Sequence, residues 1–194
     1  LYTPIDEKHP LQGQSPYSAT KIGADKIAES FYCSFNLPVT TIRPFNTFGP
    51  RQSARAVIPT IITQALAGNT VRLGSLTPVR DLTYVTDTVQ GFIRLAESKQ
   101  TVGKTVNTGS GTGVTIGELA DLIIAQVNPK ARIVTEKRRV RPDKSEVRKL
   151  VCDNRLAREL AGWEPAVSLE EGISMTIDWM KDHAGSYKTG VYTV

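Results

Sequence analysis

Short runs of β-branched residues alternate with helical repeats of apolar residues along most of the 194-residue chain. The β-branched runs predict strands at 39–43, 71–73, 82–85, 105–107 and 132–134. Apolar residues that recur every three or four positions predict helices at 16–36, 56–67, 87–97, 119–127, 154–161 and 169–181. This alternation favours an α/β fold with a parallel sheet. Because strict alternation is lost in the second half, we also expect a small mixed α/β lobe.

The first predicted helix has the clearest start. Ser15 supplies a capping hydroxyl, and Pro16 occupies the first helical position, where a backbone N–H is not needed. One face of this helix is predicted to be buried and consists of Ala24, Ile27, Ala28, Phe31 and Phe35. Thr115 and Glu118 have the spacing of a capping box in front of the helix predicted at 119–127.

The composition is typical of a globular protein, with 40% hydrophobic and 22% charged residues. No apolar run approaches the roughly 18 residues that a membrane-spanning helix needs, and residues 1–7 do not resemble a signal peptide. We therefore expect a soluble, cytoplasmic protein without a membrane partner. Because the chain opens on Leu1 in an irregular segment, we also expect it to be the later part of a longer polypeptide.

Cysteine and histidine are too few and too scattered to predict a metal site. Cys33 and Cys152 are the two cysteines and have no CxxC partner, which argues against a disulfide framework or a zinc site. We expect both thiols to be packed inside the protein. His9 and His183, the two histidines, lack an HExxH-like spacing and are expected at the surface.

Positive charge is concentrated in residues 130–149. This segment holds nine basic and three acidic residues, an excess larger than the net charge of +5 of the whole chain. Such a segment can bind nucleic acid, but it lacks the interleaved aromatic residues and the recognition motifs of that class, so no nucleic-acid partner is expected. We expect it to attract a smaller anion, with most of its side chains on a solvated face.

Tyr17 and Lys21 stand four residues apart near the start of the first predicted helix, so their side chains share one face. A phenol has an unperturbed pKa of about 10 and is a poor base at neutral pH. A neighbouring ammonium group and the positive end of a helix both favour the phenolate. The same spacing also occurs on ordinary exposed helices, so the pair needs further context.

That context is a set of four motifs in a fixed order. They lie at 15–21 (SPYSATK), 43–51 (RPFNTFGPR), 80–85 (RDLTYV) and 141–142 (RP). Together they resemble the extended short-chain dehydrogenase/reductase family of NAD-dependent sugar-nucleotide epimerases and dehydratases. The resemblance continues through 162–165 (GWEP) and the helix that follows. Within the family, residues 6–17 and 50–55 are most similar to the 4,6-dehydratases that act on nucleotide-linked N-acetylhexosamines.

The resemblance implies a site for hydride transfer that involves a tyrosine base. Tyr17 would take the proton from the sugar C4 hydroxyl while hydride passes to NAD. Lys21 would lower the pKa of the phenol and hold the nicotinamide ribose. Pro44 and Phe45 would border the nicotinamide, so the implied cofactor-binding residues are Tyr17, Lys21, Pro44 and Phe45.

The implied substrate-binding residues are spread along the chain. Asn46 would contact the substrate phosphate, and the strand that ends at Leu73 would lie along the nucleobase. Arg80 and Arg141 would clamp the diphosphate, a role that suits a planar, permanently charged guanidinium group. Thr115 also starts a helix near the nucleotide in this interpretation, but a structural role as a helix cap is favoured for it.

The chain departs from the family in one respect. A glycine-rich motif that binds the dinucleotide pyrophosphate precedes the tyrosine in the family, and no such motif lies before Tyr17. The glycines at 109–113 come too late to replace it, and the family has a turn of the small lobe there. We interpret 1–50 as the remainder of a Rossmann-like NAD-binding domain. Residues 51–194 would mostly form the nucleotide-sugar-binding lobe, with 82–108 returning to the Rossmann-like sheet.

The leading hypothesis is a nucleotide-sugar 4,6-dehydratase that uses tightly bound NAD and no metal. A C4 epimerase or a decarboxylase of the same family stays open, because the residues that decide among these reactions would precede residue 1. A non-catalytic nucleotide-sugar-binding module also stays open. Family members commonly dimerise through the helix that bears the tyrosine and lysine. A homodimer is therefore expected, with Phe31, Tyr32 and Phe35 as candidate contacts.

Overall fold

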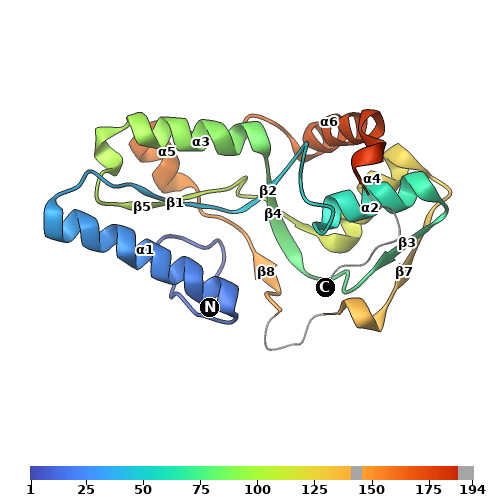
Figure 1. Ribbon diagram of the computed structural model, residues 1–194, viewed down its shortest axis with the longest axis horizontal. Coiled ribbons are helices and arrows are strands. Elements are labelled where there is room, and N and C mark those ends of the chain that lie inside the picture. The colour runs from blue at the N-terminus through green and yellow to red at the C-terminus, as the bar shows by residue number, and fades with distance from the viewer. Residues whose placement is uncertain (141–145, 188–194) are drawn as a thin grey trace.

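Helices and strands alternate along an elongated molecule in the computed structural model, which describes residues 1–140 and 146–187 (Figure 1). The α-helices are α1 (Pro16–Phe35), α2 (Val57–Ala67), α3 (Val85–Glu97), α4 (Ile116–Val127), α5 (Arg155–Ala161) and α6 (Leu169–Asp182). The strands are β1 (Thr41–Pro44), β2 (Asn46–Phe48), β3 (Thr70–Leu73), β4 (Val79–Tyr84), β5 (Thr105–Thr108), β6 (Gly113–Thr115), β7 (Arg132–Thr135) and β8 (Lys149–Leu150). Short 3-10 helices follow at η1 (Lys99–Thr101), η2 (Lys137–Arg139) and η3 (Ala184–Ser186). The predicted α/β fold class is confirmed.

The strands of the described chain form small sheets rather than one continuous sheet. β1 pairs in parallel with β5, with Thr41 opposite Thr105, and β3 pairs in parallel with β7, with Thr70 opposite Arg132. β4 is the central strand of the remaining sheet, because it pairs in parallel with β2 and β8 and antiparallel with β6. This arrangement fixes β4 by neighbours along its whole length.

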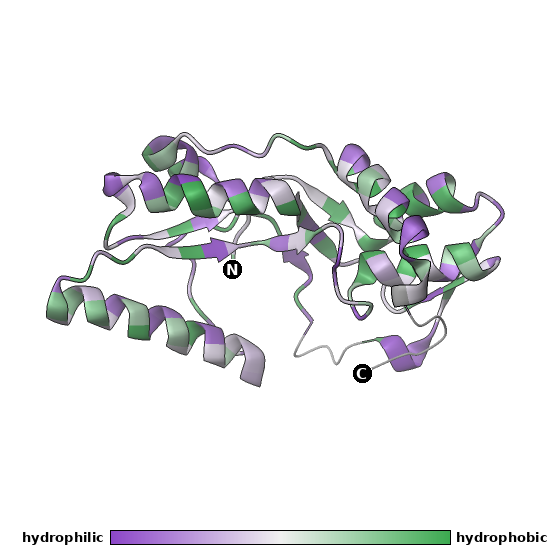
Figure 2. Ribbon diagram, turned by 45° about the horizontal axis from the view of Figure 1, so that its top comes forward, coloured by the Kyte–Doolittle hydropathy of each residue, from purple (hydrophilic) through white to green (hydrophobic). Residues whose placement is uncertain are grey.

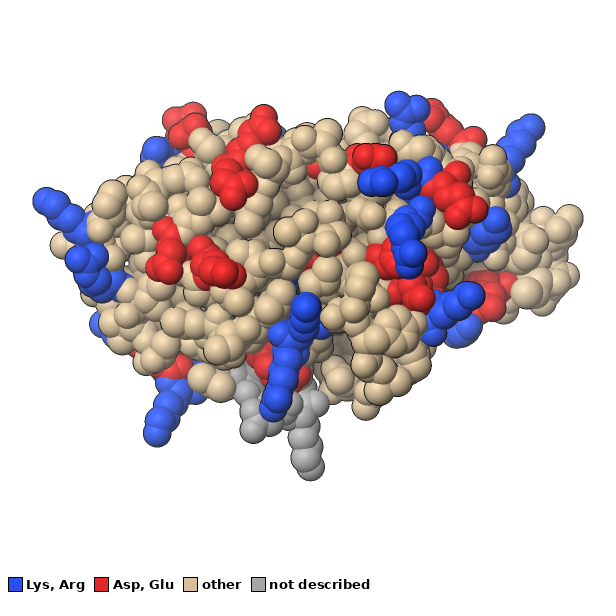
Figure 3. Space-filling view, turned by 180° about the vertical axis from the view of Figure 1, so that it is seen from behind, with Lys and Arg blue, Asp and Glu red and all other residues tan. Residues whose placement is uncertain are grey.

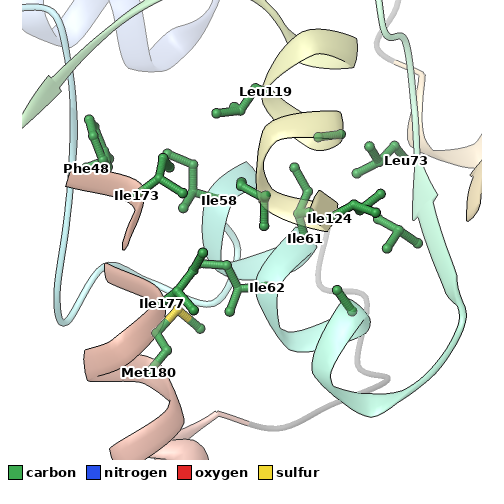
Figure 4. Packing of buried hydrophobic residues seen from close by; sticks show 14 of the residues in the cluster. Phe48, Ile58, Ile61, Ile62, Leu73, Leu119, Ile124, Ile173, Ile177 and Met180 are labelled. Atoms are coloured by element: carbon green, nitrogen blue, oxygen red, sulfur yellow. The ribbon is translucent and has the colours of Figure 1, made fainter. Parts of the chain in front are cut away.

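Two hydrophobic clusters occupy the two halves of the molecule. The larger one lies among α2, α4, α6 and strands β2 to β4, and includes Phe48, Ile61 and Ile173 (Figure 4). The smaller one packs β5 against α3 and α5 around Val106 and Trp163. β2 and β4 run between the two halves (Figure 1). Phe48 of β2 and Leu82 and Tyr84 of β4 contribute their side chains to the larger cluster.

The short strands β2, β6 and β8 were not predicted. Residues 46–48 follow Pro44 and precede Gly49, which favoured a loop, yet they pair with Leu82–Tyr84 of β4. β6 and β8 contain only three and two residues. They exist because β4 offers them backbone partners, and strands of this length leave too little sequence pattern to detect.

α1 begins and ends where its sequence indicates. The Ser15 hydroxyl accepts a hydrogen bond from the Ser18 N–H, and the Ser18 side chain accepts one from the Ser15 N–H. Pro16 occupies the first helical position, and Asn36 ends the helix with a left-handed φ of 53°. The predicted helix start is confirmed.

The prediction that one face of α1 is buried is wrong. α1 contains no buried residue. The side chains of Ile27, Phe31 and Phe35 are 63%, 46% and 73% exposed. Apolar segments recur along α1, which lies at the margin of the molecule (Figure 2). The helical repeat identified the apolar face correctly, but it carried no information on whether another element covers that face.

The cysteines and histidines differ in part from expectation. Cys152 is buried as predicted, but Cys33 lies on α1 and is exposed. His183 is at the surface, where its ring stacks on Trp179 with 4.1 Å between ring centroids. His9 is half-buried. Among the described residues, no group of His, Cys, Asp and Glu could hold a metal ion, and none of the described helices has the length and apolar character to cross a membrane.

One buried carboxylate joins three segments of the chain. Asp81 of β4 is completely buried. Its Oδ1 accepts hydrogen bonds from the N–H and the hydroxyl of Ser110, at 2.8 and 2.7 Å. Its Oδ2 accepts from the N–H groups of Gly111 and Cys152, at 2.9 and 3.0 Å. Cys152 in turn forms a parallel bridge with Ile5, so the N-terminal loop is attached to the same contact.

Replacing Asp81 with Asn is expected to lower the free energy of unfolding by about 3 kcal/mol, because an amide NH2 would then face backbone N–H donors. Urea unfolding followed by circular dichroism measures this loss. Asp121→Asn, which changes an exposed carboxylate on α4, is the control and should alter stability by less than about 0.5 kcal/mol. A loss of less than about 1 kcal/mol for Asp81→Asn would contradict the role given to this carboxylate.

Candidate functional site

Tyr17 and Lys21 share one face of the first turns of α1, as their spacing predicts. The Lys21 Nζ lies 5.6 Å from the centroid of the Tyr17 ring. The Tyr17 side chain is 71% exposed. At this distance the ammonium group acts on the phenol through space, and the first turn of the helix adds its own positive potential. Both side chains are exposed, so a ligand can reach the phenol and the ammonium group together.

A cavity of about 210 Å³ lies beside the carboxyl ends of β1 and β5. Its lining comes from the N-terminal loop, the two strands and β8, and comprises Ile5, Asp6, His9, Leu11, Arg43, Pro44, Phe45, Asn107 and Leu150. Pro44 and Phe45, which were predicted to border a cofactor, are among these residues, whereas Tyr17 and Lys21 are not. In open α/β folds, ligands bind outside the carboxyl ends of parallel strands. The cavity is therefore in the position expected for a ligand site.

Asn107 fastens the N-terminal loop to this cavity. Its backbone N–H donates to Glu7 Oε1 at 2.8 Å, and its side-chain amide donates to the carbonyl of Ile5 at 3.2 Å. Asn107 is almost completely buried at the end of β5. Neither Glu7 nor Asn107 was predicted to have a role. The polar amide of Asn107, directly after the β-branched pair at 105–106, is the sequence signal that could have indicated a role for this residue.

An ion pair joins the helix that carries Tyr17 and Lys21 to the strand that borders the cavity. Arg43 Nε on β1 lies 2.7 Å from Asp25 Oδ2 on α1, and both side chains are half-buried. Asp25 is four residues after Lys21 and therefore lies on the same helix face. Arg43 immediately precedes Pro44. The pair thus fixes how the Tyr17 and Lys21 face of α1 is turned relative to β1.

Asn46 and Arg80, the predicted phosphate-binding residues, lie on the paired strands β2 and β4. The Asn46 side-chain amide donates to the carbonyl of Asp81 at 2.9 Å. The Arg80 guanidinium donates through Nη2 to Glu146 Oε1 at 2.7 Å and through Nη1 to the carbonyl of Val147 at 2.6 Å. The structure thus brings Asn46 and Arg80 to neighbouring positions. It also gives Arg80 an acidic partner, Glu146, which was not predicted to have a role.

Leu73 and Arg141 are the other two predicted substrate-binding residues. Leu73 is 4% exposed, belongs to the larger hydrophobic cluster and has its carbonyl bonded to the N–H of Glu136. Its side chain serves the core rather than an open surface. Arg141 lies outside the described residues, so its predicted diphosphate contact stays a prediction.

The glycines at 109–113 have a structural role in this molecule. The N–H groups of Ser110 and Gly111 already bind the Asp81 carboxylate, so they are not free to bind a pyrophosphate. Thr115 caps α4, because its hydroxyl accepts from the N–H of Glu118, while Glu118 Oε2 accepts from the N–H and hydroxyl of Thr115. These hydrogen bonds lower the pKa of Glu118. The cap interpretation of Thr115 is confirmed.

Glu136 neutralises part of the basic segment. Its carboxylate accepts from Arg138 Nε and Arg139 Nε, each at 2.9 Å, and from Arg72 Nη1 at 3.2 Å. The hydrogen bonds from Arg138 and Arg139 lower the pKa of Glu136 to about 2. Acidic and basic side chains are interspersed over the face of the molecule shown in Figure 3. The segment therefore does not act as an uninterrupted cationic surface.

Comparison with known proteins places this geometry in a family. Residues 1–176 match the family described as GDP-mannose 4,6 dehydratase. The chain belongs to this family. Its resemblance to NAD-dependent sugar-nucleotide epimerases and dehydratases, inferred from the motifs at 15–21, 43–51 and 80–85, is confirmed.

Individual relatives include both dehydratases and epimerases. A dTDP-glucose 4,6-dehydratase from Xanthomonas campestris is 31% identical, in a match that covers 89% of this chain and 51% of that protein. A UDP-glucose 4-epimerase from Mycolicibacterium smegmatis is 31% identical, in a match that covers 92% of this chain and 57% of that protein. The chain spans about half the length of the curated relatives that it matches.

A solved structure supports the same fold. The dTDP-glucose 4,6-dehydratase from Bacillus anthracis in complex with NAD superimposes with a TM-score of 0.83 at 28% identity, covering 94% of this chain and 57% of that chain. The structural neighbours are Rossmann-fold enzymes, so the chain adopts a large part of that fold. The family is enzymatic, and a nicotinamide cofactor is typical of its solved members.

Acidification should remove the stabilisation that Glu136 provides. The pKa of Glu136 in the folded chain is about 2, below its ordinary value of 4.5, so its ion pairs stabilise fully above pH 4.5 and are lost as the pH falls towards 2. We expect the urea midpoint of the wild-type chain to exceed that of Glu136→Gln at about pH 6. The difference should shrink steadily between pH 4.5 and pH 2.

Other carboxylates titrate over the same range, so the two proteins are compared at each pH and only their difference is interpreted. A midpoint difference that stays constant over this range would contradict the assigned pKa of Glu136.

Proposed function

We propose that this chain carries the proton-transfer and diphosphate-binding residues of a nucleotide-sugar 4,6-dehydratase that uses NAD. The observation that carries the proposal is the exposed Tyr17 with the Lys21 Nζ 5.6 Å from its ring, in a chain of a dehydratase and epimerase family. The Asp25–Arg43 ion pair links this helix to the cavity that Pro44 and Phe45 border. In this proposal, residues 1–50 and 82–108 form the cofactor side and the other residues the nucleotide-sugar side.

The cavity fits one end of a nicotinamide cofactor. Its walls are largely the apolar side chains of Ile5, Leu11, Pro44, Phe45 and Leu150, which suit a flat ring. A site for the pyrophosphate is not offered by the glycines at 109–113, whose N–H groups bind Asp81. In the proposal, the pyrophosphate is bound by a segment that corresponds to the half of the relatives that this chain does not match. NAD, when bound, would accept a hydride from the sugar and return it.

The chain's own residues would then manage protons and charge. Tyr17, as a phenolate whose charge Lys21 stabilises, would take the proton from the C4 hydroxyl of the sugar and become a neutral phenol. Lys21 would also hold the nicotinamide ribose. A ketone at C4 acidifies the C5 proton, so water can leave across C5 and C6. Asn46 and Arg80 would hold the diphosphate through this sequence, and Arg141 would join them.

A C4 epimerase is the alternative. It is favoured by the UDP-glucose 4-epimerase relative, which is as similar to this chain, at 31% identity, as the dehydratase relative. Both reactions begin with the same oxidation at C4, so Tyr17 and Lys21 would serve either one. A decarboxylase would use the same start. As a separate polypeptide, the chain could also act as a nucleotide-sugar-binding module without catalysis, because it spans about half of its relatives.

We also propose a homodimer in which α1 of one copy packs on α1 of the other. The exposed side chains of Phe31 and Phe35 lie on this helix with ring centroids 5.6 Å apart. Tyr32 is half-buried on the same helix. Covering the two phenylalanines would remove a contiguous apolar surface from water, which is the usual basis of such contacts.

The product of the complete gene, incubated with NAD and with UDP- or GDP-N-acetylglucosamine, is expected to release a 4-keto-6-deoxy sugar nucleotide. Mass spectrometry detects the loss of one water molecule, and proton NMR detects the new methyl group at C6. A product of unchanged mass that is the 4-epimer would reject the dehydratase proposal in favour of the epimerase.

In the same assay, Tyr17→Phe is expected to lower kcat by about a hundredfold or more, because the proton acceptor for the C4 hydroxyl is removed. KM should change little, since the phenol is not part of the diphosphate contact. Tyr32→Phe removes a phenol from the same helix and is the matched control, with activity expected close to that of the wild-type protein. Retention of kcat by Tyr17→Phe would exclude Tyr17 as the base.

A further inference from the structure

Arg80 is held more tightly than a surface arginine would be. Its Nη2 lies 2.7 Å from Glu146 Oε1, and its Nη1 donates to the carbonyls of Val147 and Val79 at 2.6 and 2.9 Å. The exposed fractions of the two side chains are 16% for Arg80 and 18% for Glu146. Backbone pairing joins the same two segments, because Arg80 lies opposite Leu150 in the β4–β8 ladder. The guanidinium is therefore fixed from two directions.

We propose that Glu146 is a positioning residue that keeps the Arg80 guanidinium in the orientation in which it binds a diphosphate. This inference rests on the proposed function, since it takes Arg80 to be a diphosphate contact. Glu146 itself does not touch the ligand in this proposal. Its carboxylate acts through Arg80, together with the carbonyl of Val147.

The hydrogen bonds of Arg80 leave donors for a ligand. A guanidinium group has five N–H donors. Within the described residues, Arg80 uses both N–H groups of Nη1 and one of Nη2. No described residue accepts from the Nε–H or from the second N–H of Nη2, which leaves both donors for phosphate oxygens. A charge-assisted contact with two donors is the arrangement by which arginine recognises phosphate groups.

Holding the side chain before the ligand arrives favours binding. A free arginine side chain samples many rotamers, and ordering one such side chain on binding weakens affinity by roughly two- to tenfold. The contacts with Glu146 and Val147 order Arg80 in advance. Glu146 also balances the charge of a cation that is largely buried, so Arg80 is not left without a counter-charge when no ligand is present.

A merely structural role for Glu146 would have different consequences. If the carboxylate served only to attach the start of β8 to β4, its removal would lower stability and leave the relative affinities for ligands with and without phosphate unchanged. If Glu146 positions Arg80, its removal acts on phosphate-containing ligands. A neutral residue that still offers a hydrogen-bond acceptor should then substitute for it.

The experiment is isothermal titration calorimetry of the chain with UDP, GDP and dTDP, and with the nucleoside that corresponds to the tightest of the three. Glu146→Ala is expected to weaken binding of the diphosphate by about two- to tenfold and to leave binding of the nucleoside unchanged. Glu146→Gln keeps an oxygen acceptor for Nη2 and should bind the diphosphate within about twofold of the wild-type chain. Glu159→Ala, which removes an exposed carboxylate on α5, is the charge-matched control and should change neither affinity.

A second measurement does not depend on a ligand. Nitrogen-15 NMR of the free chain should show a resolved, slowly exchanging Arg80 Nη2–H signal in the wild-type chain and in Glu146→Gln, because Nη2 donates to residue 146. The signal should be lost or broadened in Glu146→Ala. Thermal unfolding of each variant establishes that it is folded under the conditions of both measurements.

The outcomes separate the inference from the proposed function. Diphosphate binding by Glu146→Ala that equals or exceeds that of the wild-type chain overturns the inference, as does a failure of Glu146→Gln to restore it. If Arg80→Ala loses diphosphate affinity in either of those cases, the proposed function stands. If Arg80→Ala binds the diphosphate as well as the wild-type chain, or if the wild-type chain binds none of the three, both are overturned.

Discussion

The architecture of this molecule depends on the buried carboxylate of Asp81. A charge taken out of water costs several kcal/mol unless hydrogen bonds replace its hydration. Here the N–H groups of three residues and one hydroxyl supply those bonds, and they come from the 109–113 loop and the segment before α5. The same residue offers its carbonyl to Asn46 and follows Arg80 in the chain. The 109–113 loop, β4 and the candidate phosphate-binding residues Asn46 and Arg80 are therefore all held in place through Asp81.

The proposed site combines residues held in place through Asp81 with the less firmly held helix α1. β4 is paired along its length and contributes Leu82 and Tyr84 to the larger core, so Arg80 and Asn46 have well-defined positions. α1 has no buried residue, and its described ion pair to the rest of the chain joins Asp25 to Arg43. Parallel sheets are usually covered on both faces and contain more than two strands. The exposed faces of α1 and the two-stranded β1–β5 sheet are consistent with a chain that spans about half of its relatives.

Features with a strong local signal could be predicted from the sequence. The start of α1 at Ser15 and Pro16 and the cap at Thr115 depend on residues within a single turn, and the spacing of Tyr17 and Lys21 sets their shared face. The α/β class followed from the alternation of patterns. The ordered motifs identified the family, although local structure alone would not have done so.

Features that depend on distant partners could not be predicted. β6 and β8 exist through pairing with β4, and the exposure of α1 depends on what lies beside it. Glu146 meets Arg80 across 66 positions in the sequence, and Glu7 meets Asn107 across 100. The side chain of Leu73, which ends the strand predicted by resemblance to lie along the nucleobase, packs in the core. Such contacts are set by topology and have no periodic signature in the chain.

The most direct test of the account is a crystal structure of the chain with a bound nucleoside diphosphate. The account predicts phosphate oxygens within hydrogen-bond distance of Arg80 and Asn46, with Arg80 still bonded to Glu146. A diphosphate bound instead at the turn that contains Arg138 and Arg139, with Arg80 and Asn46 free of ligand contacts, would contradict it.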